Sequence, residues 1–558
     1  MGSMSDLEFE VPASNTTNLA GGKAYEMSQK QVLAQLACTN CFNGTFYAAS
    51  SENLKLAKNT ALKLRSDPLF IAKTAIYARN KGYMKDMPAF LTVMLAGLDS
   101  KLFRKTFRKV INNGKMLRTF VKIARSGEAG KKYNLSSGSM RHALGEWFNN
   151  TSNLSLLNAS VGTPSMRDIL RMTRPTPASK EKAAMFAWLK GADFNRETRT
   201  FQTFGQDGKL IYEHSFDSLP NEVKNYENYK QFRDGDVPKI DFRLLDSLNL
   251  GKEQWTQIAL NAPWNMTKKN LNTFARHGVF ESQENTTFIA QKLQDKEILA
   301  KAHVFPYELL SAWRATSSNA NIPAIIRDAL QQAMENATEN VPVFDGNVYV
   351  CIDTSGSMSS PVTGYKPGAT TVVRCVDVAA MLAASILRKN KNAQVVPFST
   401  HVHKHSLNAR DSIVTNINRL TQLGGGGTDC ASALRYLNAH SAMGNTVIFV
   451  SDYESWIENN RYSLGTGLMA EWKTYCSRNP NAKLICIDLT PNATAQVVER
   501  KNILQVGGFS DNVFNVIDSF IKYGFEEKNH WVAEIESISL DEKPVIVDYD
   551  DDDEEVES

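Results

Sequence analysis

The chain has 558 residues, of which 42% are hydrophobic and 22% charged, a composition that suits roughly two to four globular domains. It has no apolar run long enough for a transmembrane helix, and its polar, acidic start lacks the apolar core of a secretory signal. The seven scattered cysteines are typical of reduced thiols, so we expect a cytoplasmic protein without membrane contact.

The net charge of +4 conceals two halves of opposite charge. Residues 1–340 carry 45 Lys and Arg against 32 Asp and Glu, a net charge of +13, whereas residues 341–558 carry 18 against 27, a net charge of −9. This asymmetry indicates two different partners, or one polyanion bound on one side.

The basic half is predicted to be helical. We expect a flexible N-terminus over residues 1–19 and one helical domain over residues 20–340. Apolar residues at helical spacing, separated by short Gly, Pro or Asn breaks, predict helices over 52–64, 68–81, 87–98, 101–111, 115–125, 165–172, 181–189, 271–276 and 322–336. No strict period is present, so the array is at most a degenerate helical repeat. Residues 202–236 are the least regular and are predicted to form an inserted loop or hairpin.

Positive charge concentrates in residues 101–141, where twelve residues are Lys or Arg and Glu128 is the only acid. Helical spacing puts Phe103, Phe107 and Val110 on one face of the first predicted helix, with Lys101, Lys105, Arg108 and Lys109 away from it. In the next helix Leu117, Phe120, Val121 and Ala124 share the apolar side. The opposite side carries a cationic stripe, which consists of Lys115, Arg118, Lys122 and Arg125. Such a stripe attracts a nucleic-acid backbone. The alternative is a solvated helix face, which would normally carry interspersed acids.

A basic loop and a short helix extend this surface. The loop leads into a helix start, whose backbone N–H groups suit phosphate, and the short helix adds two outward cations. The residues that we predict to contact RNA are Lys105, Arg108, Lys109, Lys115, Arg118, Lys122, Arg125, Lys131, Lys132, Arg141, His142, Arg167 and Arg171.

In the acidic half, an apolar strand over residues 348–352 leads into Asp353-Thr-Ser355-Gly-Ser357. Further strands are predicted over 393–398, 446–450 and 483–488, alternating with helices, which favours a doubly wound parallel sheet. Thr428 follows a run of four glycines, and Asp452 follows the third strand. Ligands bind such sheets beyond the carboxyl ends of the strands. Asp353, Ser355, Ser357, Thr428 and Asp452 are therefore predicted to hold a hard divalent cation, Mg²⁺ above all.

Three other patterns carry less weight. Asp488 also ends a predicted strand, and we interpret it as a loop acid. Cys38 and Cys41 have C-x-x-C spacing without a second pair, and His401, His403 and His405 alternate as in a surface loop. No nucleophile–base motif or phosphate-binding loop is present in the sequence.

The five predicted metal ligands, over residues 345–525, resemble the metal-ion-dependent adhesion site of a von Willebrand factor A domain. Joined to the helical half, this pattern resembles the TROVE family, the Ro autoantigen protein and its bacterial relatives. The stretches that carry the likeness are Asn43–Tyr47, Ala75–Asn80, Met140–Phe148, Asp168–Arg171, Met266–Phe280 and Lys301–Pro306. Family members often have a His where this chain has Met166, which makes Arg141, Arg167 and Arg171 the better candidates for RNA contact.

The resemblance implies a monomeric ring of HEAT-like helical pairs closed by the A domain. It also implies Y-like noncoding RNA on the basic outer surface and single-stranded 3′ ends of misfolded RNA in the central hole, as in RNA quality control. An exoribonuclease or another RNA-processing protein is then an expected partner.

Three functions remain open from the sequence. The first is a non-enzymatic RNA-binding scaffold, and the second a metal-dependent adhesion-type adaptor whose main ligand is a protein. The third, a metal-dependent nuclease, is disfavoured because two-metal nucleases need more carboxylates than Asp353 and Asp452. Residues 526–558 form a separate C-terminal segment, whose acidic tail, residues 541–558, is either a solubilising end or an internal mimic of nucleic acid.

Overall fold

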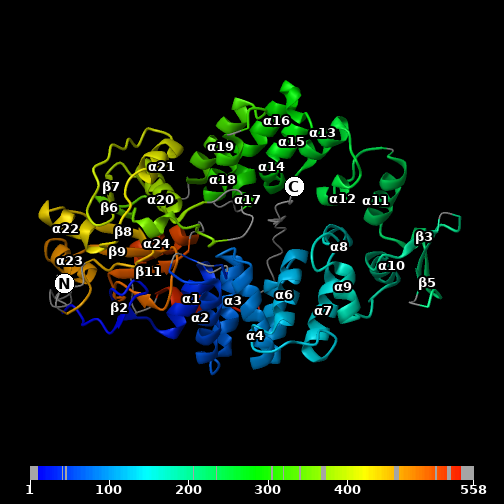
Figure 1. Ribbon diagram of the computed structural model, residues 1–558, viewed down its shortest axis with the longest axis horizontal. Helices are drawn as coiled ribbons and strands as arrows, with labels where there is room; N and C mark the ends of the chain where they lie inside the picture. The colour runs from blue at the N-terminus through cyan, green and yellow to red at the C-terminus, as the bar shows by residue number, and fades with distance from the viewer. Residues whose placement is uncertain are drawn as a thin grey trace. The chain divides into compact units, whose positions relative to one another are not determined.

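The structure is a computed structural model (Figure 1). It describes residues 10–39, 42–43, 45, 47–195, 197–204, 207–233, 235–302, 306–317, 319–338, 341–365, 373–457, 464–508, 512–523 and 530–541. The chain divides into two compact units. The first combines residues 1–88, 293–320 and 324–539, and the second combines residues 89–292, 321–323 and 540–558. These units cut across the boundary predicted at residue 340.

The first unit contains a five-stranded parallel sheet in the order β11-β9-β8-β6-β7, which confirms the predicted doubly wound domain. Its strands are β6 (Val348–Asp353), β7 (Ala393–Phe398), β8 (Thr446–Ser451), β9 (Lys483–Asp488) and β11 (Ile503–Gly507). Ile352 pairs in register with Val450, and Val450 with Ile487, so the strands end at one edge. Nearly every strand residue is buried, as continuous apolar runs predict.

Helices cover the sheet on both faces. Alternate strand residues such as Cys351 and Phe449 join a core with Trp472 and Tyr475. That core is completed by α22 (Ala431–Ala439) and α23 (Gly467–Arg478). On the other face α20 (Cys375–Lys389) packs against β6, β7 and β8, with α21 (Ile413–Thr421) beside it. The helix α24 (Asn512–Tyr523) contacts β11.

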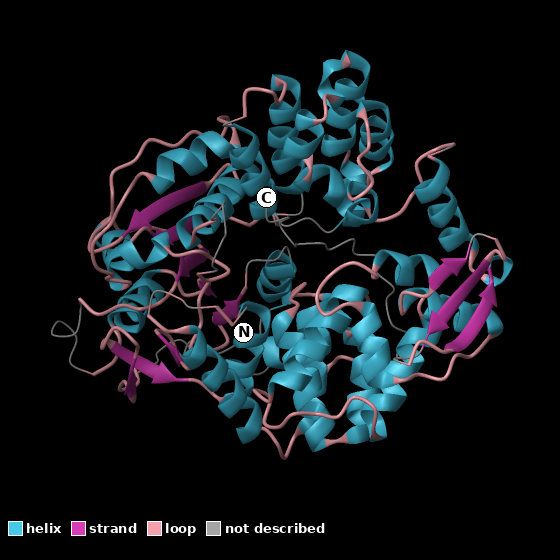
Figure 2. Cartoon of the chain, turned by 45° about the vertical axis from the view of Figure 1, so that its right-hand side comes forward, coloured by secondary structure: helices cyan, strands magenta, loops and turns pink. Residues whose placement is uncertain are grey.

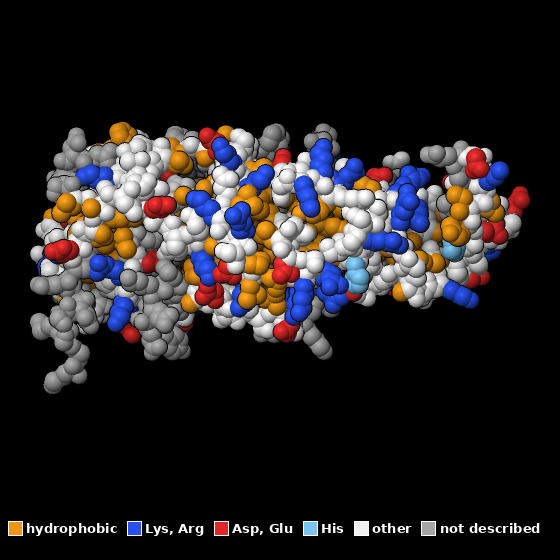
Figure 3. Space-filling view, turned by 90° about the horizontal axis from the view of Figure 1, so that it is seen from below, with side chains coloured by type: hydrophobic (Ala, Val, Ile, Leu, Met, Phe, Trp, Pro, Cys, Tyr) orange, Lys and Arg blue, Asp and Glu red, His pale blue; other side chains and the backbone are white. Residues whose placement is uncertain are grey.

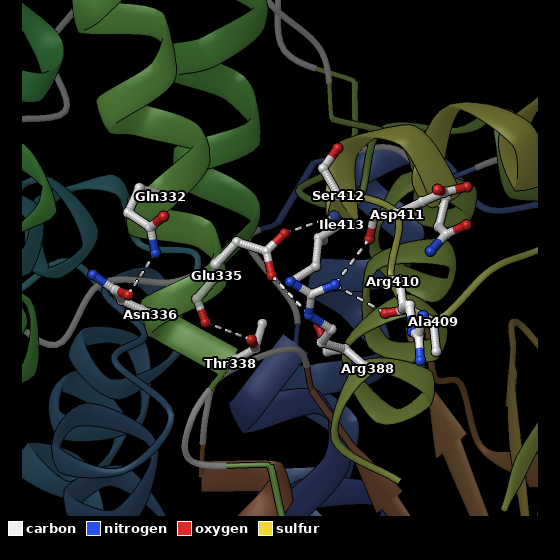
Figure 4. Close-up of polar contacts among 12 residues, drawn as sticks. Gln332, Glu335, Asn336, Thr338, Arg388, Ala409, Arg410, Asp411, Ser412 and Ile413 are labelled. Carbon is white, nitrogen blue, oxygen red and sulfur yellow. Dashed lines mark hydrogen bonds and ion pairs between the residues drawn. The ribbon is translucent and has the colours of Figure 1, made fainter. Parts of the chain in front are cut away.

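Helices from the predicted helical half belong to this same unit. They are α1 (Gln29–Thr39), α2 (Ser50–Lys63), α3 (Pro68–Asn80), α17 (Lys296–Ala302), α18 (Pro306–Ser317) and α19 (Ala324–Ala337). Figure 4 shows how α19 meets the parallel-sheet domain through Glu335. One carboxylate oxygen of Glu335 accepts the N–H of Ile413 at 2.9 Å, and the other lies 3.4 Å from Nε of Arg388.

Both ends of the chain return to this unit. The segment 10–19, predicted to be flexible, is held: the N–H of Ser14 donates to Leu464, and β1 (Thr16–Thr17) pairs with β2 (Lys23–Glu26). The strand β2 also pairs with β10 (Thr494–Ala495). The helix α25 (His530–Glu536) packs on α1 and α3, where Nε1 of Trp531 donates to the Tyr77 hydroxyl at 3.0 Å. Residues 1–9 lie outside the described part.

The second unit is mainly helical. Its helices are α5 (Ser100–Val110), α6 (Gly114–Ser126), α7 (Gly138–Asn150), α8 (Asn153–Asn158), α9 (Met166–Thr173), α10 (Lys180–Leu189), α11 (Asn221–Phe232), α12 (Phe242–Asp246), α13 (Lys252–Asn261), α14 (Trp264–Lys269) and α15 (Leu271–Arg276). The helices α4 (Asp86–Leu98) and α16 (Gln283–Gln294) lie at its two boundaries with the first unit. No described helix is both long and apolar enough to cross a membrane.

A three-stranded antiparallel sheet interrupts these helices (Figure 2). It consists of β3 (Asp193–Asn195), β4 (Thr200–Phe204) and β5 (Leu210–Ser215). The hairpin β4–β5 overlaps the start of the range 202–236, for which we predict a loop or hairpin. The rest of that prediction is wrong, because residues 221–232 form the helix α11.

The amphipathic pattern of α5 and α6 is confirmed. Phe103, Phe107 and Phe120 are fully or almost fully buried and pack together, with ring centroids 5.0 to 6.1 Å apart. Asp99 and Asn113 accept backbone N–H groups at the two helix starts, which satisfies donors that the helix leaves open. This aromatic core fixes which sides of the two helices face outward.

Candidate metal site and basic surface

The five predicted metal ligands lie at the carboxyl edge of the parallel sheet, all at most 4% exposed. Asp353 is the last residue of β6, and Asp452 follows β8, the neighbouring strand. The hydroxyl oxygens of Ser355 and Ser357 lie 3.2 Å apart in the loop and short helix after β6. The Ser357 hydroxyl also hydrogen-bonds with the Asp452 carboxylate. The loop after β6 and the segment after β8 therefore meet.

The glycine run carries Thr428 to the same place. The N–H of Gly425 donates to Thr354 at 2.8 Å, and Gly426 accepts from the N–H of Gly356 at 3.0 Å. Gly424 has φ +91°, and a Cβ there would lie 2.2 Å from the Thr354 carbonyl oxygen, so a side chain does not fit. Thr428 itself is 1% exposed and accepts the N–H of Trp456 at 3.2 Å. The glycines thus allow a close backbone contact between the two loops.

The electrostatics of the two carboxylates suit a cation. Burial raises the pKa of Asp452, and burial together with the neighbouring charge of Asp452 raises the pKa of Asp353. Two buried carboxylates close together repel each other when both are ionised, and a divalent cation would remove that cost. The donors are all carboxylate or hydroxyl oxygens, the ligands that Mg²⁺ and similar ions prefer. The residues present therefore fit the predicted ion.

Three further residues support this site, and the sequence interpretation omitted them. Ser451 donates its hydroxyl hydrogen to the second oxygen of Asp353 at 2.6 Å. Glu454 accepts the N–H of Ala20 at 3.0 Å, which attaches the N-terminal segment beside the site. The Tyr47 hydroxyl hydrogen-bonds with Ser357, and burial and the charge of Asp452 raise its pKa to about 12. Ser451 could be found from its place at a strand end. Tyr47 ends a stretch that carries the family likeness, but nothing in that stretch indicates a contact with Ser357.

Asp488 is not in a loop: it is the last residue of β9 and is 7% exposed. Its carboxylate accepts the N–H of Thr490 at 3.0 Å, as in a turn. Burial raises its pKa well above the ordinary value. Asp488 therefore supports the backbone at the sheet edge.

Most predicted RNA-contact residues are exposed in the second unit. Arg108, Lys122, Arg125, Lys131, Lys132, Arg141, His142, Arg167 and Arg171 are exposed, and Lys105 and Lys115 are partly exposed. Arg108 pairs with Glu146 of α7 at 2.5 Å, a partner distant in sequence. On the face drawn in Figure 3, Lys and Arg side chains are scattered over the surface, some beside Asp and Glu and others beside apolar side chains.

Two of the predicted RNA contacts, Arg118 and Lys109, are buried. Arg118 is 4% exposed, and its guanidinium donates to the Ala159 carbonyl oxygen at 3.0 Å. Gly162 lies against the same guanidinium, where a Cβ would come within 2.8 Å of it. Lys109 is 8% exposed. The predicted exposure of these two cations is wrong, and for Arg118 the reason is that the segment with Ala159 and Gly162 covers its guanidinium.

Met166 is 1% exposed and lies near Gly114 of α6, where a Cβ would be 3.5 Å from its methyl carbon. The departure from the family pattern at this position therefore places an apolar side chain in the core. Arg167 and Arg171, on the same helix, remain exposed.

The structure gives little support to a function for the cysteine and histidine patterns. Cys38 is a buried free thiol, and Cys41 lies outside the described residues. The rings of His401 and His403 are tilted by 52° to each other with centroids 4.6 Å apart, and His403 hydrogen-bonds with the Ser399 hydroxyl at 2.8 Å. Within the described part of the chain, no cluster of three or more His, Cys, Asp or Glu could hold a metal.

Fold and site together define a protein that joins an array of helices to a von Willebrand factor A domain. Residues 347–521 match the family described as the Ro60 vWA domain. The chain is 20% identical over 542 residues to a Deinococcus radiodurans protein named RNA-binding protein RO60, covering 90% of this chain and 95% of that protein.

The crystal structure of the Deinococcus radiodurans Ro (RSR) protein has a similar fold, with a TM-score of 0.56 and 16% sequence identity. The match covers 89% of this chain and 99% of that one. The chain is thus similar to these Ro proteins over most of its length, and its residues 347–521 match their von Willebrand factor A domain.

Proposed function

We propose that this protein binds RNA as the protein component of a Ro-type ribonucleoprotein in the cytoplasm, and that it is not itself an enzyme. Y-like noncoding RNA would bind the exposed cations of the second unit, and single-stranded 3′ ends of misfolded RNA would enter the central hole that the family resemblance implies. The observation that carries the proposal is the group of exposed cations on α6, α7 and the loop between them, which includes Lys122, Arg125, Lys131, Lys132 and Arg141.

The name of the Deinococcus relative supports the same class of ligand. Phosphate contacts from such cations give an affinity that falls steeply with salt, without requiring a particular base sequence. Arg141 and Arg167 lie near the starts of α7 and α9, where backbone N–H groups add to the attraction for phosphate.

A charge-reversal pair tests the proposal. Lys122→Glu combined with Arg125→Glu should weaken binding of a hairpin RNA with a 3′ tail by at least ~10-fold and reduce the salt slope by about 2. The matched control is Lys55→Glu with Lys63→Glu, which makes the same charge change at exposed positions on α2 of the other unit. Equal loss in both pairs would mean that net charge alone matters, and no loss in the first pair would refute the α6 surface.

For the A domain, we propose that Asp353, Ser355, Ser357, Thr428 and Asp452 hold Mg²⁺. The ion would supply a positive charge that accepts a carboxylate from a partner. The chain's own side chains would position it: Ser451 orients Asp353, and Ser357 joins the two acidic loops.

One observation favours the adaptor function beside RNA binding. Trp456 and Ile457 are 45% and 42% exposed, although they directly flank the glycine run. A Cβ on Gly427 would lie 2.6 Å from Ile457 and 2.7 Å from Trp456. Exposed apolar side chains beside a cation site suit a protein ligand with an acid and an apolar neighbour.

The adaptor function is tested with a purified 3′ exoribonuclease immobilised on a sensor surface. Wild-type protein should bind it in Mg²⁺, whereas Asp353→Ala and Trp456→Ala should each reduce the binding and leave RNA affinity unchanged. Leu464→Ser, at another exposed apolar residue, is the control. Binding that survives chelation of Mg²⁺ would show that the partner does not bind through the metal site.

A further inference from the structure

The first acid of the tail contacts the basic side of α5. Nζ of Lys105 lies 2.5 Å from a carboxylate oxygen of Asp541, and both belong to the second unit. The hydrogen bond from Lys105, followed by the charges of Lys109 and Lys101, lowers the pKa of Asp541. The acidic tail therefore begins in direct contact with Lys105, a cation that we assign to RNA.

The residues after Asp541 carry a charge that complements this surface. Residues 541–558 include ten Asp and Glu and a single Lys, a net charge of −9, with six consecutive acids at 550–555. An extended chain spans at most ~3.5 Å per residue, so the acidic run can lie within roughly 50 Å of Lys105. Since α5 and α6 are each less than ~20 Å long, their exposed cations are within its reach.

A single exposed ion pair contributes little to stability, so the Lys105–Asp541 contact alone would not hold the tail. The contact does fix the point at which the acidic segment of the sequence begins, beside Lys105 of α5. A tethered segment has an effective concentration in the millimolar range, so even weak multivalent binding competes with a ligand in solution. The opposite charge of the two segments and the point where the tail begins select this tail as the occupant.

We propose that residues 542–558 occupy the exposed cations of α5 and α6 and act as an intramolecular competitor, which RNA must displace in order to bind. The inference rests on the proposed RNA-binding function and adds regulation to it. Weak or short polyanions would be excluded at low salt, and only ligands with many phosphates would displace the tail. The competitor is itself held by charge, so salt releases it too.

Three proteins test this competition. One is the full chain, the second ends at Leu540, and the third keeps its length but has the acids of 550–555 replaced by Asn and Gln. In low salt, both altered proteins should bind the same tailed RNA several-fold more tightly than the full chain. The difference should disappear at high salt, because the tail then no longer competes, so the full chain should show the shallower salt slope. Asp541→Asn, which leaves every cation in place, should give a smaller change in the same direction.

A second measurement needs no RNA. A zero-length carbodiimide reagent should link carboxylates of 548–557 to Lys101, Lys105 or Lys122 in the full chain. Excess RNA should reduce these links. Equal RNA affinity and equal salt slope in the three proteins would overturn the competition. Links only to lysines of the first unit would overturn the location. If no protein binds RNA at all, the proposed function fails, which is distinct from equal binding by all three.

Discussion

Arg314 of α18 and Asp377 of α20 form a two-point ion pair, with each guanidinium nitrogen 2.8 Å from one carboxylate oxygen. Asp377 is fully buried, and Arg374 donates to the same carboxylate. Burial by itself would raise the pKa of Asp377, but the two guanidinium groups hold it at about 2. The pair connects a helix of the sequence's basic half to the A domain, so the two form one folding unit in this region.

Asp377→Asn should destabilise the first unit by about 3 kcal/mol, because it leaves two guanidinium groups facing a neutral amide at a buried site. Hydrogen exchange of α20 amides would measure the loss in the full chain, where global unfolding is not two-state. The control is Asp518→Asn, which removes an exposed pair with Lys522 and should cost less than ~1 kcal/mol. Similar effects of the two changes would show that burial of Asp377 has no energetic consequence.

The same ion pair makes the stability of the first unit depend on pH. The pKa of Asp377 in the folded state, about 2, lies below its ordinary value of 3.8. The ion pair therefore stabilises the fold fully above pH 4, and this contribution declines as the pH falls toward 2. In the Asp377→Asn protein, that part of the acid dependence should be absent. A wild-type acid profile that the substitution leaves unaltered would contradict this.

Glu499 should produce the opposite pH dependence. It is 8% exposed and accepts hydrogen bonds from Gln31 at 2.7 Å and from the N–H of Gln505 at 3.2 Å. Burial raises its pKa to about 7 from 4.5, so ionising it costs more in the folded state. Stability should fall as the pH rises from about 4.5 to 7, and Glu499→Gln should be more stable than wild type at pH 8 by ~2 kcal/mol.

Thermal unfolding between pH 5 and pH 8 measures this difference. Asp328→Asn, at an exposed position of the same unit, is the matched control and should leave the profile unchanged. If Glu499→Gln is less stable than wild type at pH 8, the hydrogen bonds from Gln31 and Gln505 outweigh the cost of the buried charge.

Arg118 and Lys122 lie one turn apart on α6 and should respond in opposite ways. Arg118→Ala should destabilise the second unit by about 1–3 kcal/mol, because the Ala159 carbonyl oxygen loses its charged donor in a buried position. Lys122→Ala should leave stability unchanged, but it should weaken RNA binding and reduce the salt slope by about 1. Urea unfolding and RNA titrations on both proteins separate the roles. Loss of RNA affinity in a stably folded Arg118→Ala protein would restore Arg118 as a direct contact.

Mg²⁺ should raise the unfolding temperature of the wild-type A domain. An ion at one hundred times its dissociation constant stabilises the folded state by about 2.7 kcal/mol. Thr428→Val keeps the shape of a buried side chain and removes only the hydroxyl, so it should lower the ion affinity with little change of fold. Asp452→Asn should abolish the Mg²⁺ effect. Thr415→Val, at a partly buried hydroxyl of α21, is the control. Calorimetric titration with Mg²⁺ gives the affinities, and wild-type stability that does not depend on Mg²⁺ would refute the site.

The sequence by itself predicted the central strands of the parallel sheet and which oxygen donors lie together at its edge, where we propose a metal site. The runs before Asp353 and Asp452 are apolar throughout, and the carboxyl ends of parallel strands share one edge, so the ligands could be placed from local pattern alone. In the same way, helical spacing identified Phe103, Phe107 and Phe120 as core.

Only the tertiary structure decided which side chains near these positions are covered. Arg118 shares its helical stripe with Lys122, yet a segment 41 residues further along the chain, at Ala159, covers it. Tyr47 reaches Ser357 from a part of the chain some three hundred residues away, and no local pattern marks it. The spacing of apolar residues along a helix predicts which side of the helix packs against the nearest core. It does not report which loop closes over a long basic side chain, because that contact depends on how distant segments pack.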